Sequence, residues 1–411
     1  MPRSFDALVI GGGQAGGEVA AGLRARHYAG SILLVTEEDH LPYSRPPLSK
    51  AYLRGLVSAE DLLLRPARFY LEHDIEVRTG ARVTSLDTAS RTAVLDDGER
   101  IAWNRVVLAT GGSPRRLPEA VLPASRNVHY IRTLRDVDRL RDSRIDGASF
   151  VVVGGGYVGL EIASVLARLG ARITLVEAAD RLLARVTSPV MSDFFLRLHR
   201  SEGVDVRLGT AVTEFRRSSE GEVTEVALDD GSVIATDQVL VGIGMTPRTE
   251  LAEAAGLRID NGIVVDALCR TSAEGVYAIG DVANVQIEDG SGRRLESMPN
   301  ASAQARVVAD HLVGTAAPHT DVPWFWSDQY DLKLQAAGTY QGADEVIVRG
   351  DPSTHAICAL YLRDGLLIGV DAVGRAVDYA TARKILNRGG HVDRSTLADG
   401  QALAASSPTS V

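Results

Sequence analysis

The chain has 411 residues, 45% hydrophobic and 24% charged, which is the composition of an ordinary globular protein with two or three domains. Its net charge of −9 gives no indication of nucleic-acid binding, and no apolar run is long enough to span a membrane. Its only cysteines are Cys269 and Cys358, and its histidines lack metal-ligand spacing, so we expect no disulfide framework and no metal site. A strand pattern begins at the N-terminus and leaves no room for a signal peptide, which predicts a cytoplasmic protein.

The first expected element is a short apolar strand over 7–10, which runs into a glycine fingerprint and a helix. Gly11 and Gly13 let the backbone approach a pyrophosphate, and Gly16 lets the helix pack on the strand. The next strand ends in Glu37, whose carboxylate suits the hydroxyls of an adenosine ribose. The sequence therefore predicts a dinucleotide-binding βαβ unit here.

A proline-containing segment over 42–50 makes this half of the chain longer than the one that follows. In disulfide-reducing flavoenzymes a CxxxxC pair occupies this region, whereas this segment has no cysteine. If the dinucleotide bound by this unit is a flavin, its electrons would therefore leave directly from the ring, and Lys50 would be a cation that stabilises the reduced ring. The alternative for Lys50 is a solvated helix lysine.

The next stretch of sequence occurs twice in similar form. The Asp-Asp-Gly steps at 96–98 and 229–231 predict hairpin turns in two β-meanders, because glycine tolerates positive φ. Each meander leads into a return strand, which ends at Thr110-Gly111 in one copy and at 242–244 in the other. These strand ends are either hinges between domains or nucleotide contacts.

A second fingerprint follows another short apolar strand and consists of Gly154, Gly156 and Gly159. The subsequent strand ends in Glu177, whose carboxylate would bind an adenosine ribose and repel a 2′-phosphate. The first arginine beyond it, Arg181, is four residues away. The sequence therefore predicts a preference for NADH over NADPH.

The helix after the second fingerprint carries apolar residues at helical spacing, which predicts one buried face. These residues are Val158, Ile162, Val165, Leu166 and Leu169. Glu161 stands on the same helix, two positions past the last glycine. It either positions a nicotinamide, pairs with Lys50 or lies on the surface.

Towards the C-terminus, a strand that ends in Gly280-Asp281 suits a carboxylate that orders the ribityl or pyrophosphate part of a flavin. The alternative is a simple turn at the end of a strand. A helix and a linker follow, and from Trp324 the pattern predicts an α+β domain with a helix over 376–387. Trp324 and Trp326 either stack at the edge of a flavin or anchor a core.

The chain resembles the FAD- and NADH-dependent ferredoxin reductases of bacterial oxygenase systems over essentially its whole length except the tail. The specific strings are Arg-Pro-Pro-Leu-Ser-Lys at 45–50 and Trp-Ser-Asp-Gln at 326–329, with further matches at 154–161, 278–281 and 296–301. The resemblance implies an α/β fold like that of glutathione reductase, with two Rossmann-like dinucleotide-binding domains and a C-terminal α+β domain. The implied divisions are an FAD domain at 1–112 and 244–320, an NADH domain at 113–243, a C-terminal domain at 321–405 and a frayed tail at 406–411.

The fingerprints and the resemblance together predict the site residues. Lys50 and Glu161 are expected to act in catalysis. The expected FAD contacts are Gly11, Gly13, Ala15, Gly16, Glu37, Arg45, Lys50, Val83, Thr110, Gly111, Arg132, Gly280, Asp281, Met298 and Trp326. The expected NADH contacts are Gly154, Gly156, Tyr157, Gly159, Glu161, Glu177, Gly244 and Glu296.

The resemblance also implies the reaction. NADH would pass a hydride to FAD, which would pass electrons singly to a [2Fe–2S] ferredoxin that feeds a cytochrome P450 or a ring-hydroxylating oxygenase. The family's ferredoxins are acidic, so Arg293, Arg294 and Lys333 are candidate docking residues. We expect a monomer or weak homodimer with no nucleic-acid or membrane partner.

Two groups of alternatives remain. An NADH oxidase, a quinone reductase or a peroxide or disulfide reductase is a different enzyme on a related fold, and the missing cysteine near 43–49 argues against thiol chemistry. An interaction protein that carries FAD and responds to NADH, resembling apoptosis-inducing factor, belongs to another class. That family often has long insertions and basic surfaces, which this chain lacks.

Overall fold

A computed structural model describes residues 3–286, 292–315 and 322–406 of the chain. They form two compact units, each assembled from separate stretches of sequence. The first unit comprises Met1–Pro47, Val57–Ser113 and Met245–Thr320, and the second comprises Leu48–Leu56, Pro114–Gly244 and Asp321–Val411. The chain changes unit after Ser113 and after Gly244, one residue beyond each expected boundary. Which nucleotide each unit holds remains a prediction.

Residues 48–56 belong to the second unit, although the sequence prediction kept them with the first. Polar contacts explain the difference: Ser49 bonds to Glu161, and the hydroxyl of Tyr52 donates to Asp138 at 2.7 Å. The tail expected at 406–411 lies outside the described residues, apart from its first residue.

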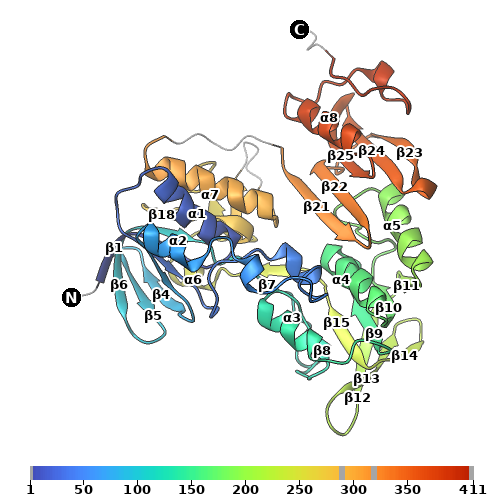
Figure 1. Cartoon of the computed structure of the whole chain (residues 1–411), viewed down its shortest axis with the longest axis horizontal. Coiled ribbons are helices and arrows are strands. Elements are labelled where there is room, and N and C mark those ends of the chain that lie inside the picture. The colour runs from blue at the N-terminus through green and yellow to red at the C-terminus, as the bar shows by residue number, and fades with distance from the viewer. Residues whose placement is uncertain (1–2, 287–291, 316–321, 407–411) are drawn as a thin grey trace. The chain divides into compact units, whose positions relative to one another are not determined.

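The first unit is built on a sheet of strand order β3-β2-β1-β6-β5-β4, with β18 paired to β6. Its strands are β1 (Arg3–Ile10), β2 (Ile32–Val35), β3 (Ile75–Arg78), β4 (Val83–Asp87), β5 (Thr92–Leu95), β6 (Arg100–Leu108) and β18 (Val276–Ala278). Ala7 and Val9 of β1 pack with α1 (Gln14–Ala25) and α7 (Met298–Leu312), which lie side by side (Figure 1). Successive side chains of a strand point to opposite faces, so Leu8 belongs to a separate core with β4 and β5.

Shorter elements complete the first unit. They are α2 (Ala67–Glu72), α6 (Glu250–Ala254) and the sheet of β17 (Ile263–Val265), β19 (Ala283–Gln286) and β20 (Gly292–Arg294). Strand β7 (Gly112–Pro114) pairs with β16 (Met245–Pro247), and the chain changes unit within β7 and directly before β16. Within the described residues, no helix combines the length and apolar character that a bilayer-spanning helix needs.

The second unit contains a parallel sheet of order β11-β10-β9-β15-β8. Its strands are β8 (Val128–His129), β9 (Ser149–Val153), β10 (Arg172–Glu177), β11 (Asp205–Leu208) and β15 (Gln238–Val241), and its helices are α3 (Leu134–Arg141), α4 (Tyr157–Arg168) and α5 (Pro189–Ser201). A separate meander consists of β12 (Val212–Arg217), β13 (Val223–Leu228) and β14 (Val233–Ala235). The order β11-β10-β9 repeats β3-β2-β1, and Gly98 and Gly231 adopt φ of 87° and 82° at the matching hairpin turns.

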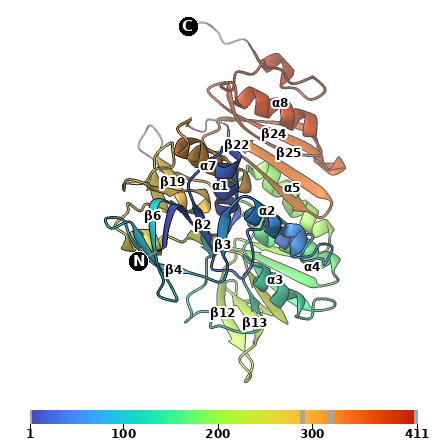
Figure 2. The same cartoon turned by 60° about the vertical axis from the view of Figure 1, so that its left-hand side comes forward.

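The C-terminal part of this unit is an antiparallel sheet of order β21-β22-β25-β24-β23 with one long helix. The elements are β21 (Trp324–Gln329), β22 (Leu332–Gly338), β23 (Glu345–Asp351), β24 (Ala356–Arg363), β25 (Leu366–Val373) and α8 (Ala376–Leu386). Helix α8 covers one face of the sheet, where Tyr379 and Ile385 pack with Leu360 and Val370 (Figure 2).

One expectation about the helix of the second fingerprint was wrong. Ile162, Val165 and Leu166 of α4 are buried, but Val158 is 46% exposed. Val158 stands in the first turn of α4, directly after the open end of the fingerprint loop. Helical periodicity alone does not distinguish this open turn from the packed turns that follow.

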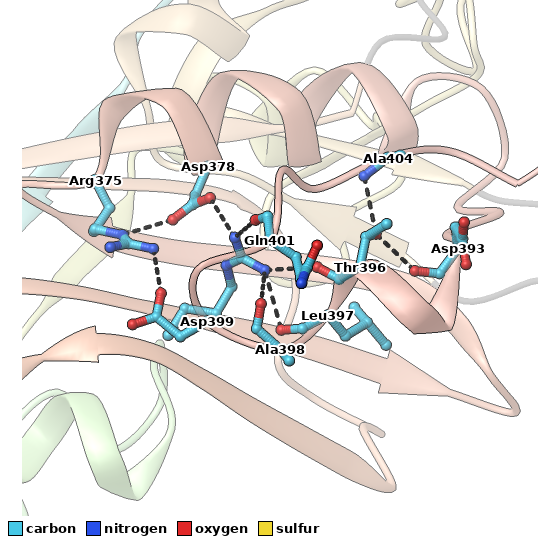
Figure 3. Close-up of polar contacts among 10 residues, drawn as sticks. Arg375, Asp378, Asp393, Thr396, Leu397, Ala398, Asp399, Gln401 and Ala404 are labelled. Carbon is cyan, nitrogen blue, oxygen red and sulfur yellow. Dashed lines mark hydrogen bonds and ion pairs between the residues drawn. The ribbon is translucent and has the colours of Figure 1, made fainter.

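A buried arginine holds the last described segment against the C-terminal sheet (Figure 3). Arg349 of β23 is 1% exposed, and its guanidinium bonds to Asp378 of α8 at 3.1 Å. Asp378 also accepts from Arg375 at 2.6 Å. The remaining acceptors are the backbone carbonyls of Thr396, Leu397, Ala398 and Gln401.

Candidate functional site

The first glycine of each fingerprint is required by the protein itself. Gly11 and Gly154 have φ of +117° and +107°, a region that favours glycine. A side chain there would overlap backbone atoms at the end of the return strand, at Ala109 and Gly242 respectively. The sequence argument assigned the requirement at Gly11 to the pyrophosphate; this packing is a second requirement, and the approach of a pyrophosphate stays a prediction.

Gly16 and Gly159 are required for packing of the helix on the loop. A Cβ at either position would overlap the carbonyl of the first glycine in the same fingerprint. The third glycine was expected to let the helix pack on the strand. It does allow close packing of the helix, but the nearest atoms belong to the fingerprint loop rather than to the strand.

The middle glycines face open space. Gly13 and Gly156 are the N-cap residues of α1 and α4, and apart from their chain neighbours no atom of the described residues lies within 4 Å of where a Cβ would stand. Neither helix has a side-chain cap or an acidic residue in its first turn. The N–H groups of both helix ends are therefore available to an anion, and both loops fit a dinucleotide pyrophosphate.

The two acidic residues predicted at the strand ends are not structurally equivalent. In each unit the first glycine donates its N–H to the second strand at 2.8 Å, at the carbonyls of Val35 and Val176. By that correspondence Glu177 matches Thr36, and Glu37 lies one residue further along. The sequence prediction treated Glu37 and Glu177 as the same position, which the backbone pairing corrects.

Glu177 holds the second fingerprint loop. Its two carboxylate oxygens accept the N–H groups of Gly155 at 2.6 Å and Ala179 at 2.8 Å. Each oxygen keeps lone pairs for a ribose hydroxyl. Arg181 donates to the carbonyl of Thr187 at 2.7 Å, so this arginine serves the loop after β10. Arg181 is therefore engaged within the protein, and the preference for an unphosphorylated ribose stays a prediction.

Glu37 instead joins a charged cluster in the first unit. Its carboxylate lies 2.7 Å from Arg248 and 3.9 Å from Arg82. Arg248 also donates to Ser113, and its carbonyl accepts from Thr110 at 2.8 Å. The hydroxyl of Thr110 thus joins the segments on either side of the β7–β16 pair within the first unit, and whether this strand end is a hinge or a nucleotide contact stays a prediction.

The strand end at Gly280 packs against the first fingerprint helix. A Cβ on Gly280 would lie 3.0 Å from the Cβ of Ala15, and φ of +77° also favours glycine. Its N–H donates to Gln304 of α7 at 2.7 Å. Asp281 follows directly, and Met298 is the first residue of α7. The loop after β18 therefore adjoins the N-terminal part of α1.

The remaining expected contacts of the first unit are more dispersed. Arg45 forms an ion pair with Glu38 at 2.6 Å, and Val83 is buried at the start of β4. The carbonyl of Gly111 accepts the N–H of Arg248 at 3.0 Å. Their contacts with FAD remain predictions.

Some residues expected to contact one nucleotide belong to the unit expected to hold the other. Lys50, Arg132 and Trp326, expected to contact FAD, belong to the second unit, whereas Glu296, expected to contact NADH, belongs to the first. Glu296 pairs there with Arg294 at 2.6 Å.

Among the candidate docking residues, Arg294 is engaged within the protein. Besides its pair with Glu296, it donates to the carbonyl of Asp281, and only 11% of its side chain is exposed. Arg293 and Lys333 are exposed. The docking prediction is therefore reduced to these two residues.

Glu161 is the centre of a buried polar cluster. It is 4% exposed, and one carboxylate oxygen lies 3.0 Å from the ammonium of Lys50. The hydroxyls of Ser49 and Ser327 donate to its two oxygens, each at 2.7 Å. Lys50 is also 3.9 Å from Asp328. The surface alternative for Glu161 and the solvated alternative for Lys50 are both excluded.

Aromatic side chains lie beside this cluster. Tyr157, at the N-terminus of α4, packs on Phe325 with ring centroids 4.6 Å apart. Burial raises the pKa of the Tyr157 phenol well above its ordinary value. Trp324 and Trp326 stack with centroids 5.7 Å apart. Gly244, the last residue of the stretch Pro114–Gly244 in the same unit, has φ of +110°.

Sequence reasoning missed the individual roles of Ser327, Gln329 and His199. The string at 326–329 was recognised only as a family signature. A signal was present, because Ser327 and Gln329 alternate along a strand and must share a face. Neither the periodicity nor the composition indicated which helices that face meets.

Comparison with known proteins places the chain in a family. Residues 5–305 match the model described as pyridine nucleotide-disulphide oxidoreductase, and residues 324–404 match the model described as reductase C-terminal. The ferredoxin reductase subunit of 5,5′-dehydrodivanillate O-demethylase from Sphingobium sp. is 43% identical over 97% of both chains. Putidaredoxin reductase from Pseudomonas putida is 40% identical over 97% of this chain and 96% of its own.

A solved structure agrees in fold. The reductase of a covalent putidaredoxin reductase–putidaredoxin complex matches with a TM-score of 0.93 and 39% identity, over 96% of each chain. The likeness thus extends through both units and the C-terminal sheet. The chain belongs to the pyridine nucleotide-disulphide oxidoreductase family and, within it, to the ferredoxin reductases that resemble putidaredoxin reductase.

Proposed function

We propose that this protein is a cytoplasmic flavoprotein reductase that takes a hydride from NADH onto FAD and passes the electrons singly to a [2Fe–2S] ferredoxin, which serves a cytochrome P450 or ring-hydroxylating oxygenase. The observation that carries the proposal is the pair of open loops at Gly13 and Gly156, one in each unit. Two helix ends available to pyrophosphates suit two dinucleotides. The names of the relatives supply the acceptor class.

In this proposal the first unit holds FAD, with the pyrophosphate at the N-terminus of α1 and the adenosine ribose towards Glu37. The bound flavin supplies a ring that takes a hydride and gives up electrons one at a time. Arg248 keeps the carboxylate of Glu37 oriented, at 2.7 Å. Asp281, in the loop beside Ala15, would meet the polar chain of the cofactor.

The second unit would hold NADH at the N-terminus of α4. Glu177 would bind the adenosine ribose while it holds the loop through Gly155. Lys50 would supply positive charge for the reduced flavin, and Glu161 fixes the position of its ammonium group. Hydride transfer needs no acid or base, so orientation and charge are the contributions of these side chains.

The cysteines support direct electron transfer rather than thiol chemistry. Cys269 and Cys358 are buried, and burial raises the pKa of each thiol to about 12. A thiol with such a pKa carries almost no thiolate at neutral pH. The proposed route therefore uses neither cysteine.

The proposal is tested with the purified protein loaded with FAD. Under anaerobic conditions NADH should bleach the flavin, and a [2Fe–2S] ferredoxin should greatly accelerate reduction of cytochrome c. A protein that takes up no FAD, or whose flavin NADH does not reduce, would overturn it. Rapid consumption of oxygen or a quinone, with no acceleration by any ferredoxin, would favour the NADH oxidase or quinone reductase alternative.

Glu177→Gln is expected to shift the cofactor preference towards NADPH. The substitution removes the negative charge that would face a 2′-phosphate but keeps an oxygen for the N–H of Gly155. The ratio of kcat/KM for NADPH to that for NADH should rise by roughly tenfold or more. Glu214→Gln, an exposed change on β12, is the control. An unchanged ratio would remove Glu177 from this role.

A further inference from the structure

Strand β21 presents one face of alternating residues to the helices of the nucleotide-binding part of the second unit. Phe325 packs on Tyr157 at the start of α4, and Ser327 reaches Glu161 one turn later. Gln329 bonds to His199 of α5 at 2.9 Å. Residues at i, i+2 and i+4 of a strand share a face, so the three contacts follow from one strand orientation.

The polar residues of this face form a buried series of hydrogen bonds in which the donor and acceptor of each bond can be assigned. Ser327, Gln329 and His199 are each fully buried. Burial lowers the pKa of His199 to about 4, so its ring is neutral at neutral pH. The amide oxygen of Gln329 can only accept, so Nε2 of the neutral ring donates to it, and Nδ1 is left to accept from the hydroxyl of Tyr330 at 3.1 Å.

The same assignment of donors and acceptors extends through Gln329 and Ser327 to Glu161. With its oxygen engaged by His199, Gln329 turns its NH₂ group to the oxygen of Ser327 at 3.3 Å. The hydroxyl proton of Ser327 is then directed to Glu161 at 2.7 Å. If the amide were reversed, Ser327 would donate to Gln329 instead, and Glu161 would lose one of its donors.

We infer that β21 is a positioning strand: through Ser327 it fixes the carboxylate of Glu161, and thereby the ammonium group of Lys50. Removal of the hydroxyl would take a donor from the Glu161 oxygen that faces Lys50, in a residue that is only 4% exposed. The C-terminal sheet would thus take part in flavin reduction, in addition to any role in docking. The inference rests on the proposed function, because it assigns Lys50 to the flavin.

The chain offers a direct readout for the position of Lys50. Its lysines are Lys50, Lys333 and Lys384, and the other two are exposed. Amine acylation with acetic anhydride, followed by peptide mass spectrometry, compares Lys50 with two internal references in the same sample. This measurement needs no NADH turnover and therefore does not depend on the electron acceptor.

Ser327→Ala is expected to raise acylation of Lys50 relative to the other lysines by roughly fivefold. It should also slow the reduction of bound FAD by saturating NADH to a similar degree, while FAD content stays the same. Ser327→Thr, which restores a hydroxyl, should return both values towards those of the parent protein. Gln329→Met should produce the same changes at smaller size and serves if Ser327→Ala does not fold.

Ser192→Ala is the matched control, because Ser192 is a buried serine of α5 outside the chain of hydrogen bonds to Glu161. Equal changes in Ser192→Ala and Ser327→Ala would overturn the inference, as would a Ser327→Ala protein that matches its parent in both readouts. If NADH fails to reduce the parent protein, the proposed function is wrong, and the acylation result still reports whether Ser327 positions Lys50.

Discussion

Lys50→Met is expected to slow the reduction of bound FAD by NADH on the order of 100-fold, the size of effect seen when one stabilising charge is removed from an active site. Lys50 contributes the positive charge of the buried cluster, and its ammonium lies 3.0 Å from Glu161. Methionine keeps the length of the side chain but leaves Glu161, at 4% exposure, without its cation. The measurement is the decay of flavin absorbance in an anaerobic stopped-flow instrument at saturating NADH.

The control is Lys384→Met on the exposed surface of α8, which removes an equal charge away from the cluster. NADH affinity should change far less than the reduction rate, because the dinucleotide is bound mainly through the loop at Gly156. A Lys50→Met protein that is reduced as fast as Lys384→Met would return Lys50 to a structural role. Glu161→Gln should show a smaller loss, since the lysine remains.

Arg349→Met is expected to lower the free energy of unfolding by about 3 to 5 kcal/mol, the range found when one partner of a buried charged pair is removed. Arg349 is 1% exposed, and it satisfies Asp378 together with carbonyls of the segment around Leu397. Methionine fills much of the volume but removes the donor to these carbonyls and leaves Asp378 with Arg375. Chemical denaturation followed by circular dichroism measures the loss.

Arg394→Met supplies the comparison. Arg394 pairs with Glu345 at 2.9 Å, but more than half of its side chain is exposed, and such pairs contribute about 0 to 1 kcal/mol. Limited proteolysis should release the segment after Asn387 in the Arg349 variant and leave it intact in the Arg394 variant. Indistinguishable denaturation midpoints for the two variants would show that the buried contacts do not hold this segment.

The parts of the fold that could be predicted from sequence depend on local physics. Four apolar residues before each glycine fingerprint leave little choice except a buried parallel strand, and both strands are present as β1 and β9. The hairpins at Gly98 and Gly231 were predictable because positive φ selects glycine. The helix expected over 376–387 was likewise predictable from its pattern, and it is present as α8.

The features that escaped prediction depend on which remote segments pack together. Nothing in the sequence distinguishes Glu37 from Glu177, because their offset is set by the pairing of each fingerprint loop with its second strand. Glu161 was placed on a helix, but its burial comes from Ser49 and Ser327, which are 112 and 166 residues away. Val158 fits a helical stripe and yet stands in the open first turn of α4.

The most direct test of the whole account is the stoichiometry of electron transfer. The FAD-loaded protein is mixed anaerobically with a limiting amount of NADH and an excess of oxidised [2Fe–2S] ferredoxin, and the visible spectrum of the iron–sulfur cluster is followed. The account predicts two ferredoxins reduced for each NADH consumed, because a hydride carries two electrons and the cluster accepts one. NADH consumption that leaves the ferredoxin oxidised would contradict it.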